Sequence, residues 1–134
     1  MTTREDNPQD WFLFGADRLR GADVLFQAQG VTYLGIEALH EAAVERYLKG
    51  YLVSKEQKLE RTHDLARLLE RAMAFDDGFE PYTLLADDLT QRFRAQHYPG
   101  GDLTDVGADY EALRKKAGDL IDLILKLTPQ KHSK

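Results

Sequence analysis

The sequence of 134 residues contains no cysteine, which excludes disulfide frameworks, thiolate zinc sites and cysteine nucleophiles. Its two serines, Ser54 and Ser133, lie in no nucleophile-elbow motif, and no glycine-rich phosphate loop follows a strand. No apolar run approaches the ~18 residues that a membrane span requires, and Met1–Asp10 has no signal-peptide core. With 18 basic and 23 acidic residues, the net charge of −5 argues against a surface that grips nucleic acid over its whole extent. These absences predict a soluble, cytoplasmic globular domain with no membrane contact.

Helical periodicity recurs five times along the chain, whereas alternating strand patterns bounded by tight turns are not found. The predicted helices run from about Asp10 to Gln29, from Thr32 to about Ser54, from an N-cap at Thr62 to a break at Asp76–Gly78, from Pro81 to Gln96 or His97, and from about Asp109 to Leu127. Mostly short connections favour antiparallel neighbours, so we expect an all-α, up-and-down antiparallel bundle of four to five helices. One domain, residues 1–134, accounts for the whole chain, with a core at about 11–127 and frayed termini.

Apolar side chains recur along one face of each predicted helix and define the expected core. These residues are Phe12, Ala16, Leu19, Ala22 and Phe26; Ile36, Leu39, Ala43, Tyr47 and Tyr51; Leu65, Leu68, Leu69 and Ala72; Leu84, Leu85, Leu89 and Phe93; and Tyr110, Leu113, Ala117, Leu120, Ile121 and Ile124. The stripe of the second helix is the widest, which predicts a central position for that helix.

The chain also carries aromatic side chains beyond what a small core needs: Trp11, Tyr33, Tyr47, Tyr51, Tyr82 and Tyr98. Such residues favour interfaces and predict a homodimer, unless they simply fill the bundle.

Two pairs of charged residues lie on the second helix. Glu37 and His40 form one Glu-x-x-His pair, but a di-iron site needs a second pair and two further glutamates, so we interpret both as residues of a partly exposed helix face. Glu45 and Lys49 have the spacing and order of a favourable helix ion pair, which is usually structural. Arg46 and Lys49 could instead meet an anion or the carboxylates of a partner.

The third helix opens with Thr62, His63 and Asp64. Thr62 is the predicted N-cap and Asp64 complements the helix dipole, so capping alone explains both. His63, placed there, could contact an anionic ligand drawn to exposed backbone amides.

Arg92 and His97 lie five positions apart near the end of the fourth helix. An imidazole can take a 2′-hydroxyl proton and a guanidinium can stabilise charge on the phosphate, so this pair has the groups for metal-independent RNA cleavage. In an unbroken α-helix the two side chains lie about 140° apart, so they converge only if the helix ends or distorts between them, as Pro99 allows. Otherwise they are ordinary residues near a helix C-terminus.

Four segments together resemble the HEPN domain family of small helical domains. Trp11, Ala16, Asp17, Leu19 and Ala22 are similar to its first helix, and residues 42–49 (AAVERYLK) to its alanine-rich second helix. Thr62–Leu65 is similar to the turn that opens its third helix, and His97–Gly100 to the Arg-Tyr-Pro segment after its fourth. The resemblance extends from about Trp11 to Leu127.

The resemblance implies a bundle of four or five helices, usually dimeric, with one of two functions. The first is a non-enzymatic binding and assembly module that accepts a nucleotide or pairs with a minimal nucleotidyltransferase in a toxin–antitoxin-like system, with His63, Glu45 and Lys49 as ligand contacts. The alternative is a metal-independent endoribonuclease that uses Arg92 and His97, although Phe93 stands where such members usually carry a polar residue. A plain oligomerisation scaffold is a third possibility. We expect no cofactor and no metal.

Overall fold

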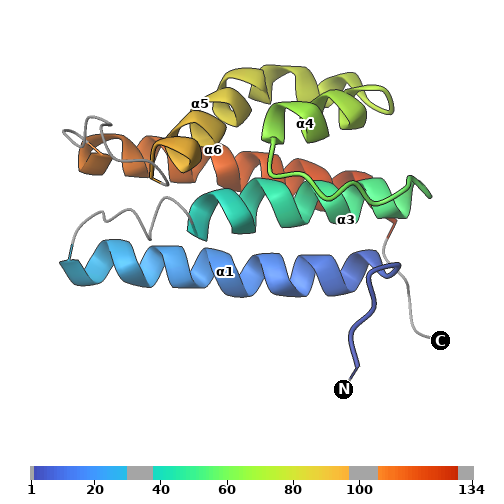
Figure 1. Ribbon diagram of the computed structural model, residues 1–134, viewed down its shortest axis with the longest axis horizontal. Coiled ribbons are helices and arrows are strands. Elements are labelled where there is room, and N and C mark those ends of the chain that lie inside the picture. Colours follow the sequence, from blue (N-terminus) through green and yellow to red (C-terminus); the bar gives the residue numbers. More distant parts are fainter. Residues whose placement is uncertain (1, 30–37, 97–105, 130–134) are drawn as a thin grey trace.

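The computed structural model describes residues 2–29, 38–96 and 106–129, and these residues form helices and no strands. The elements in chain order are α1 (Pro8–Gln29), the π-helix η1 (His40–Arg46), α3 (Tyr47–Ser54), α4 (Leu65–Met73), the 3₁₀-helix η2 (Asp77–Tyr82), α5 (Thr83–Gln96) and α6 (Val106–Leu127). Helix α1 lies antiparallel to η1 and α3, while α4, α5 and α6 cover the other side of the segment formed by η1 and α3 (Figure 1). The described part of the chain is therefore an all-α bundle, as the sequence predicted.

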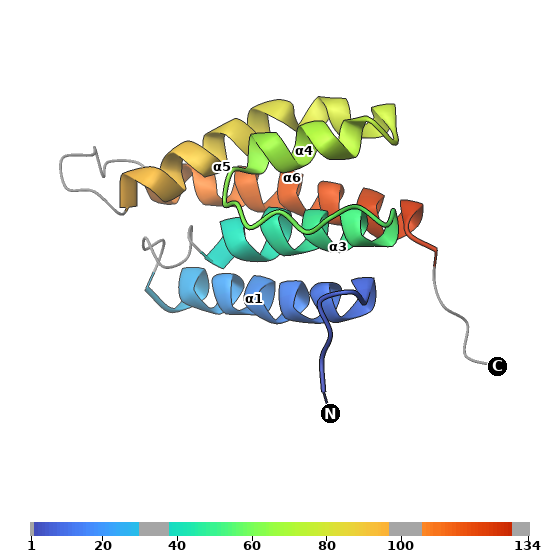
Figure 2. The same ribbon diagram turned by 45° about the vertical axis from the view of Figure 1, so that its right-hand side comes forward.

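The core forms around the central segment of η1 and α3, which lies between α1 and the remaining helices in both views (Figure 2). Six consecutive residues of α3, from Tyr47 to Leu52, are buried, which confirms the predicted central position of this helix. All six predicted stripe residues of α6 are buried as well: Tyr110, Leu113, Ala117, Leu120, Ile121 and Ile124. The hydrophobic periodicity thus identified most of the core before any tertiary contact was known.

Gly50 allows α1 and α3 to approach each other closely. A Cβ atom at this position would lie 2.6 Å from Cε1 of Phe12 and 2.9 Å from Cβ of Trp11. One turn away, the ring of Phe12 stacks on Tyr47 with the centroids 5.4 Å apart. The absence of a side chain at Gly50 therefore sets the distance between the two helices.

Several predicted helix starts were wrong by a few residues. Helix α1 begins at Pro8, two residues before the expected Asp10, because Asn7 Oδ1 accepts from the Gln9 amide and proline suits the first helical position. Pro81 lies inside η2, because Asp76 accepts from the Gly78 amide and starts a helical turn earlier than expected. Helix α6 begins at Val106, three residues before Asp109.

The N-cap of α4 is Asp64 and not Thr62. The Asp64 carboxylate accepts from the backbone amide of Arg67 at 3.2 Å, whereas Thr62 Oγ1 accepts from the Asp64 amide and orders the turn before the helix. Both side chains accept a hydrogen bond from a backbone amide here, Thr62 in the turn before the helix and Asp64 in the first turn of the helix.

The burial of one predicted stripe residue differs from expectation. Leu84, assigned to the apolar stripe of the fourth helix, is 80% exposed, because Leu85, Ala86 and Leu89 fill the inward face of α5. Tyr47 and Tyr51 were counted both in the core stripe and among the surplus aromatic residues, and their burial confirms the place in the core. They therefore give no support to a dimer interface.

Other predictions fall on residues outside the described ranges, including those for Tyr33, Glu37, His97 and Tyr98. No helix among the described residues is both long and apolar enough to cross a membrane.

Candidate functional site

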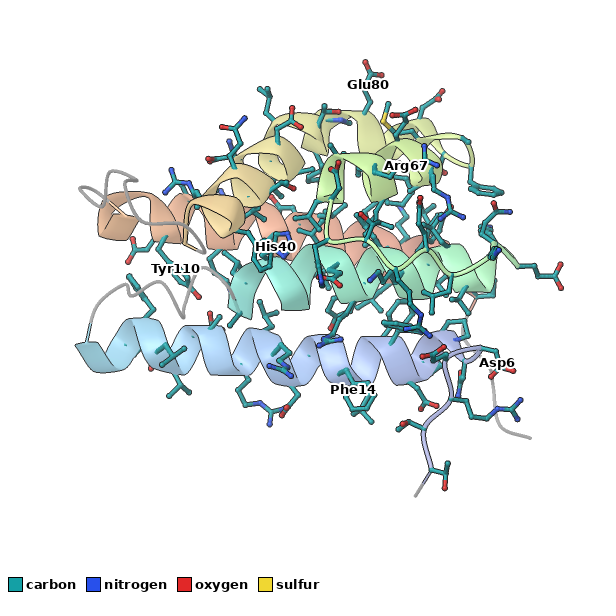
Figure 3. All side chains as sticks on the ribbon, viewed as in Figure 1. Asp6, Phe14, His40, Arg67, Glu80 and Tyr110 are labelled. Carbon is teal, nitrogen blue, oxygen red and sulfur yellow. The ribbon has the colours of Figure 1, made fainter. Side chains whose placement is uncertain are left out.

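Four polar side chains from three segments meet inside the bundle: His40 and Glu45 of η1, Lys49 of α3, and His63, which precedes the N-cap of α4. We call these four residues the polar cluster. His40 lies inside the bundle, where η1 packs against α5 and α6 (Figure 3). Glu45, Lys49 and His63 were all predicted as ligand contacts, and the structure brings the three together.

The carboxylate of Glu45 is the centre of the polar cluster. Lys49 Nζ donates to Glu45 Oε1 at 2.8 Å, and His63 Nδ1 lies 3.0 Å from both carboxylate oxygens. His40 Nδ1 lies 3.9 Å from Glu45 Oε2. One buried carboxylate therefore faces a lysine and two imidazole rings.

The π-helix explains how His40 and Glu45 come to lie so close. They are five positions apart, which in an α-helix would separate them by about 140° around the axis. In η1 the backbone hydrogen bonds span five residues, so five residues make roughly one turn and both side chains leave the same side. The expectation that His40 lies on a partly exposed helix face was wrong, because this residue is fully buried.

His40 is neutral at ordinary pH. Burial lowers the pKa of this imidazole to about 4, and the opposing attraction of Glu45 only partly offsets that effect. Its Nε2 lies 3.1 Å from the carbonyl oxygen of His63, which can only accept, so the neutral ring carries its proton on Nε2. The ring also stacks on Phe93 of α5 with a centroid distance of 4.3 Å. His40 thus joins η1 to α5 and to the turn before α4.

Glu45 and Lys49 form a buried ion pair, with side chains 8% and 9% exposed. Burial by itself would raise the pKa of Glu45, but hydrogen bonds from Lys49 and His63 outweigh it and the pKa lies below its usual range. The prediction of an ion pair is correct. Both groups are enclosed by the surrounding helices.

His63 is the exposed member of the polar cluster, with 65% of its side chain in contact with solvent. Because Glu45 accepts from Nδ1–H, the neutral ring keeps the lone pair of Nε2 for another partner. Phe93 lies beside this ring as well, at a centroid distance of 5.7 Å. The carboxylate fixes the orientation of the exposed imidazole and leaves its Nε2 open to a ligand.

Three backbone amides at the start of α4 are already paired inside the chain. The amide of Asp64 donates to Thr62, that of Leu65 donates to Thr90, and that of Arg67 donates to Asp64. These three amides are therefore not available to attract an anion to this helix end. Any ligand contact at His63 comes from the imidazole itself.

The predicted catalytic pair is only half described. Arg92 Nε donates to Asp88 Oδ1 at 2.8 Å, which is an ordinary pair four residues apart on α5. His97 lies outside the described residues, so the structure does not bring the two together or separate them.

Among the described residues no group of three or more His, Cys, Asp or Glu side chains is arranged to hold a metal ion. In the polar cluster one nitrogen of each imidazole already has a partner within the chain: His63 Nδ1 pairs with Glu45, and His40 Nε2 pairs with a backbone carbonyl. Glu37, the other half of the Glu-x-x-His pair, is outside the described residues.

Two members of the site were not foreseen. His40 was assigned to a partly exposed helix face, and Phe93 to the core stripe and to the position after Arg92, yet their rings stack at the polar cluster. A histidine directly after the stripe residue Leu39 was the one available signal, because a polar residue so close to an apolar stripe needs a partner when it is buried.

The family comparison agrees with the resemblance carried by the sequence segments. The family model described as HEPN domain matches residues 9–127, which include α1 from its second residue, every later element to the end of α6 and all four residues of the polar cluster. Comparisons with curated proteins and with solved structures find no significant match. Because the family model matches most of the chain, the chain belongs to the HEPN domain family.

Proposed function

We propose that this HEPN protein is a binding and assembly module that accepts a nucleotide at the polar cluster. In this proposal it acts as a homodimer and pairs with a minimal nucleotidyltransferase. The observation that carries the nucleotide site is that Lys49 and His63, from two other segments, both contact the buried carboxylate of Glu45. Of the three side chains, only the imidazole of His63 is largely exposed.

Stability alone is a poor reason for this arrangement. Burying an ion pair costs several kcal/mol per ion before the charges attract each other, and apolar side chains of similar volume often stabilise a fold as well or better. The pair also holds His63 in one orientation through the 3.0 Å contacts to Nδ1. Orientation of an exposed imidazole is a benefit that an apolar core could not supply, which favours a binding role.

His63 supplies the ligand contact, because Lys49 is already paired with Glu45 and mostly buried. In this proposal the exposed imidazole contacts a phosphate oxygen through Nε2, because Nδ1 already faces the Glu45 carboxylate. The partly buried ring of Phe93 forms an apolar wall beside it. This combination suits a phosphate group attached to a planar base.

The test is a thermal-shift screen followed by calorimetric titration with ATP, GTP, CTP and UTP. A ligand that binds the native state raises the melting temperature. Loss of one charged hydrogen bond predicts an about tenfold higher Kd for His63→Ala. Lys58→Ala is the matched control, since Lys58 is another exposed basic residue of the loop before α4 and should bind as the wild type does. Absence of a shift with all four nucleotides, or equal binding by His63→Ala, would refute the nucleotide site.

The alternative function remains a metal-independent endoribonuclease with His97 as base and Arg92 as phosphate ligand. One observation favours it: Phe93, the residue after Arg92, contacts both imidazoles of the polar cluster, so the first half of the motif adjoins the same site. RNA cleavage in the presence of a chelator, abolished in His97→Ala, would support this activity. Intact RNA, or equal cleavage by that variant, would exclude it.

A further inference from the structure

The outward face of α1 carries a stripe of four residues that no described part of the chain covers. Leu13, Asp17, Arg20 and Val24 follow at intervals of four, three and four, so they lie within about 60° of one another around the helix. All four are exposed, and Leu13 and Val24, large apolar side chains, are 50% and 59% exposed. Helix α1 packs on η1 and α3 through its opposite side (Figure 1).

The stripe is complementary to itself when reversed. Positions 13 and 24, and likewise 17 and 20, are placed symmetrically about the point between residues 18 and 19. If a second α1 lies antiparallel across that point, Leu13 meets Val24 of the other copy and Asp17 meets Arg20. A two-fold axis repeats both contacts, which gives two apolar pairs and two ion pairs in one interface.

The geometry points to a homodimer in which the α1 helices of two copies pack antiparallel along this stripe. The spacing is that of the a and d positions of a coiled coil, whose antiparallel form pairs an a residue with a d residue. Within the described residues neither Asp17 nor Arg20 has an ion-pair or hydrogen-bond partner of its own side chain, so both charges are available to the second copy. Gly21 adds no side chain at the edge of the stripe, and a Cβ atom at this position would have nothing within 4 Å.

A second copy fits this face better than an unrelated partner does. An unrelated partner would carry the complementary charges on its own surface. Binding to such a partner would not require Asp17 and Arg20 to be placed symmetrically within α1. Phe14, 45% exposed and pointing away from the bundle, lies beside the stripe and extends the apolar area (Figure 3). This inference rests on the homodimer of the proposed function and is independent of the nucleotide site.

Charge reversal tests the pairing across the axis. Each of the variants Asp17→Arg and Arg20→Asp places like charges opposite each other twice, so sedimentation equilibrium should show a dimer Kd raised about tenfold or more. The double variant Asp17→Arg/Arg20→Asp restores opposite charges and should return to the wild-type Kd. Leu84→Asp, at a leucine of α5 that is 80% exposed, is the control that should leave the Kd unchanged.

Crosslinking tests the direction of the helices, and the chain has no cysteine that would interfere. In the antiparallel pair, residues 13 of the two copies are about 16 Å apart along the axis, since eleven residues rise by 1.5 Å each. A bismaleimide shorter than that span should link Leu13→Cys/Val24→Cys into covalent dimers and leave Leu13→Cys alone monomeric. Covalent dimers of Leu13→Cys alone would refute the antiparallel arrangement.

The outcomes separate this inference from the wider proposal. A wild-type dimer that is unaffected by both charge reversals would overturn the α1 interface and leave the homodimer intact. A monomer at all concentrations would overturn both. Nucleotide binding is measured separately through His63 and does not depend on either result.

Discussion

The Glu45–Lys49 pair gives the sharpest test of how charges are accommodated in this bundle. Glu45→Gln removes the carboxylate 2.8 Å from Lys49 Nζ and leaves an ammonium group whose side chain is only 9% exposed. Breaking a buried pair at one partner costs about 3–5 kcal/mol, and the amide oxygen of glutamine can still accept one hydrogen bond. We therefore expect a loss of about 3 kcal/mol in the free energy of unfolding.

The double variant Glu45→Gln/Lys49→Met distinguishes the cost of a stranded charge from the value of the pair. Methionine keeps the length of the lysine stem without its charge, so no ion remains buried without a partner. We expect this variant to recover most of the loss, to within about 1 kcal/mol of the wild type. It should not bind nucleotide, because His63 has lost the carboxylate that orients it.

Urea unfolding followed by far-UV circular dichroism measures both free energies. Glu60→Gln is the control of identical chemistry, since Glu60 pairs with Arg67 and Arg71 at the surface and should cost less than about 1 kcal/mol. If the double variant is as unstable as Glu45→Gln, the ion pair is needed for the fold itself. A role in binding would then not be the reason for the buried pair.

Three further predictions concern stability. Because the pKa of His40 is lowered to about 4 in the folded state, the unfolded chain takes up a proton at a higher pH than the folded chain does. The free energy of unfolding should therefore fall by up to about 3 kcal/mol as the pH drops from about 6.5 to 4. When the urea midpoint is measured against pH, His40→Phe should lack this decrease. Gly50→Ala should lower the free energy of unfolding by about 1–3 kcal/mol, since its Cβ would overlap the ring of Phe12; an unchanged melting temperature would contradict the close packing of α1 on α3. Asp64→Ala should cost about 1 kcal/mol and more than Thr62→Ala, because only Asp64 caps α4; equal losses in denaturant titrations would return the cap to Thr62.

The fold was predictable from the sequence because its information is local. Apolar residues at helical spacing identified the inward faces of α1, α3 and α6 without any knowledge of their partners. Errors arose where a polar side chain competed for a backbone amide, as with Asn7, Asp64 and Asp76. Helix ends depend on such single hydrogen bonds, which periodicity does not record.

The site was predictable only in part. The four-residue spacing of Glu45 and Lys49 predicts their ion pair, but nothing in the sequence places His63, eighteen positions after Glu45, against the same carboxylate. Its contact arises from the path of the loop between α3 and α4, a tertiary feature. The stacking of Phe93 on His40 likewise joins residues that are distant in the chain.

The π-helix bears on the choice between the two functions. A spacing of five residues brings His40 and Glu45 together because η1 departs from α-helical geometry. Arg92 and His97 have the same spacing, but α5 is α-helical from Arg92 to Gln96, and an α-helix continued to His97 would hold the two side chains about 140° apart. The endoribonuclease therefore needs either a departure from α-helical geometry at His97 or a second subunit that completes the site. The nucleotide site needs neither, since its three side chains already meet within one chain, which is why we place binding before catalysis.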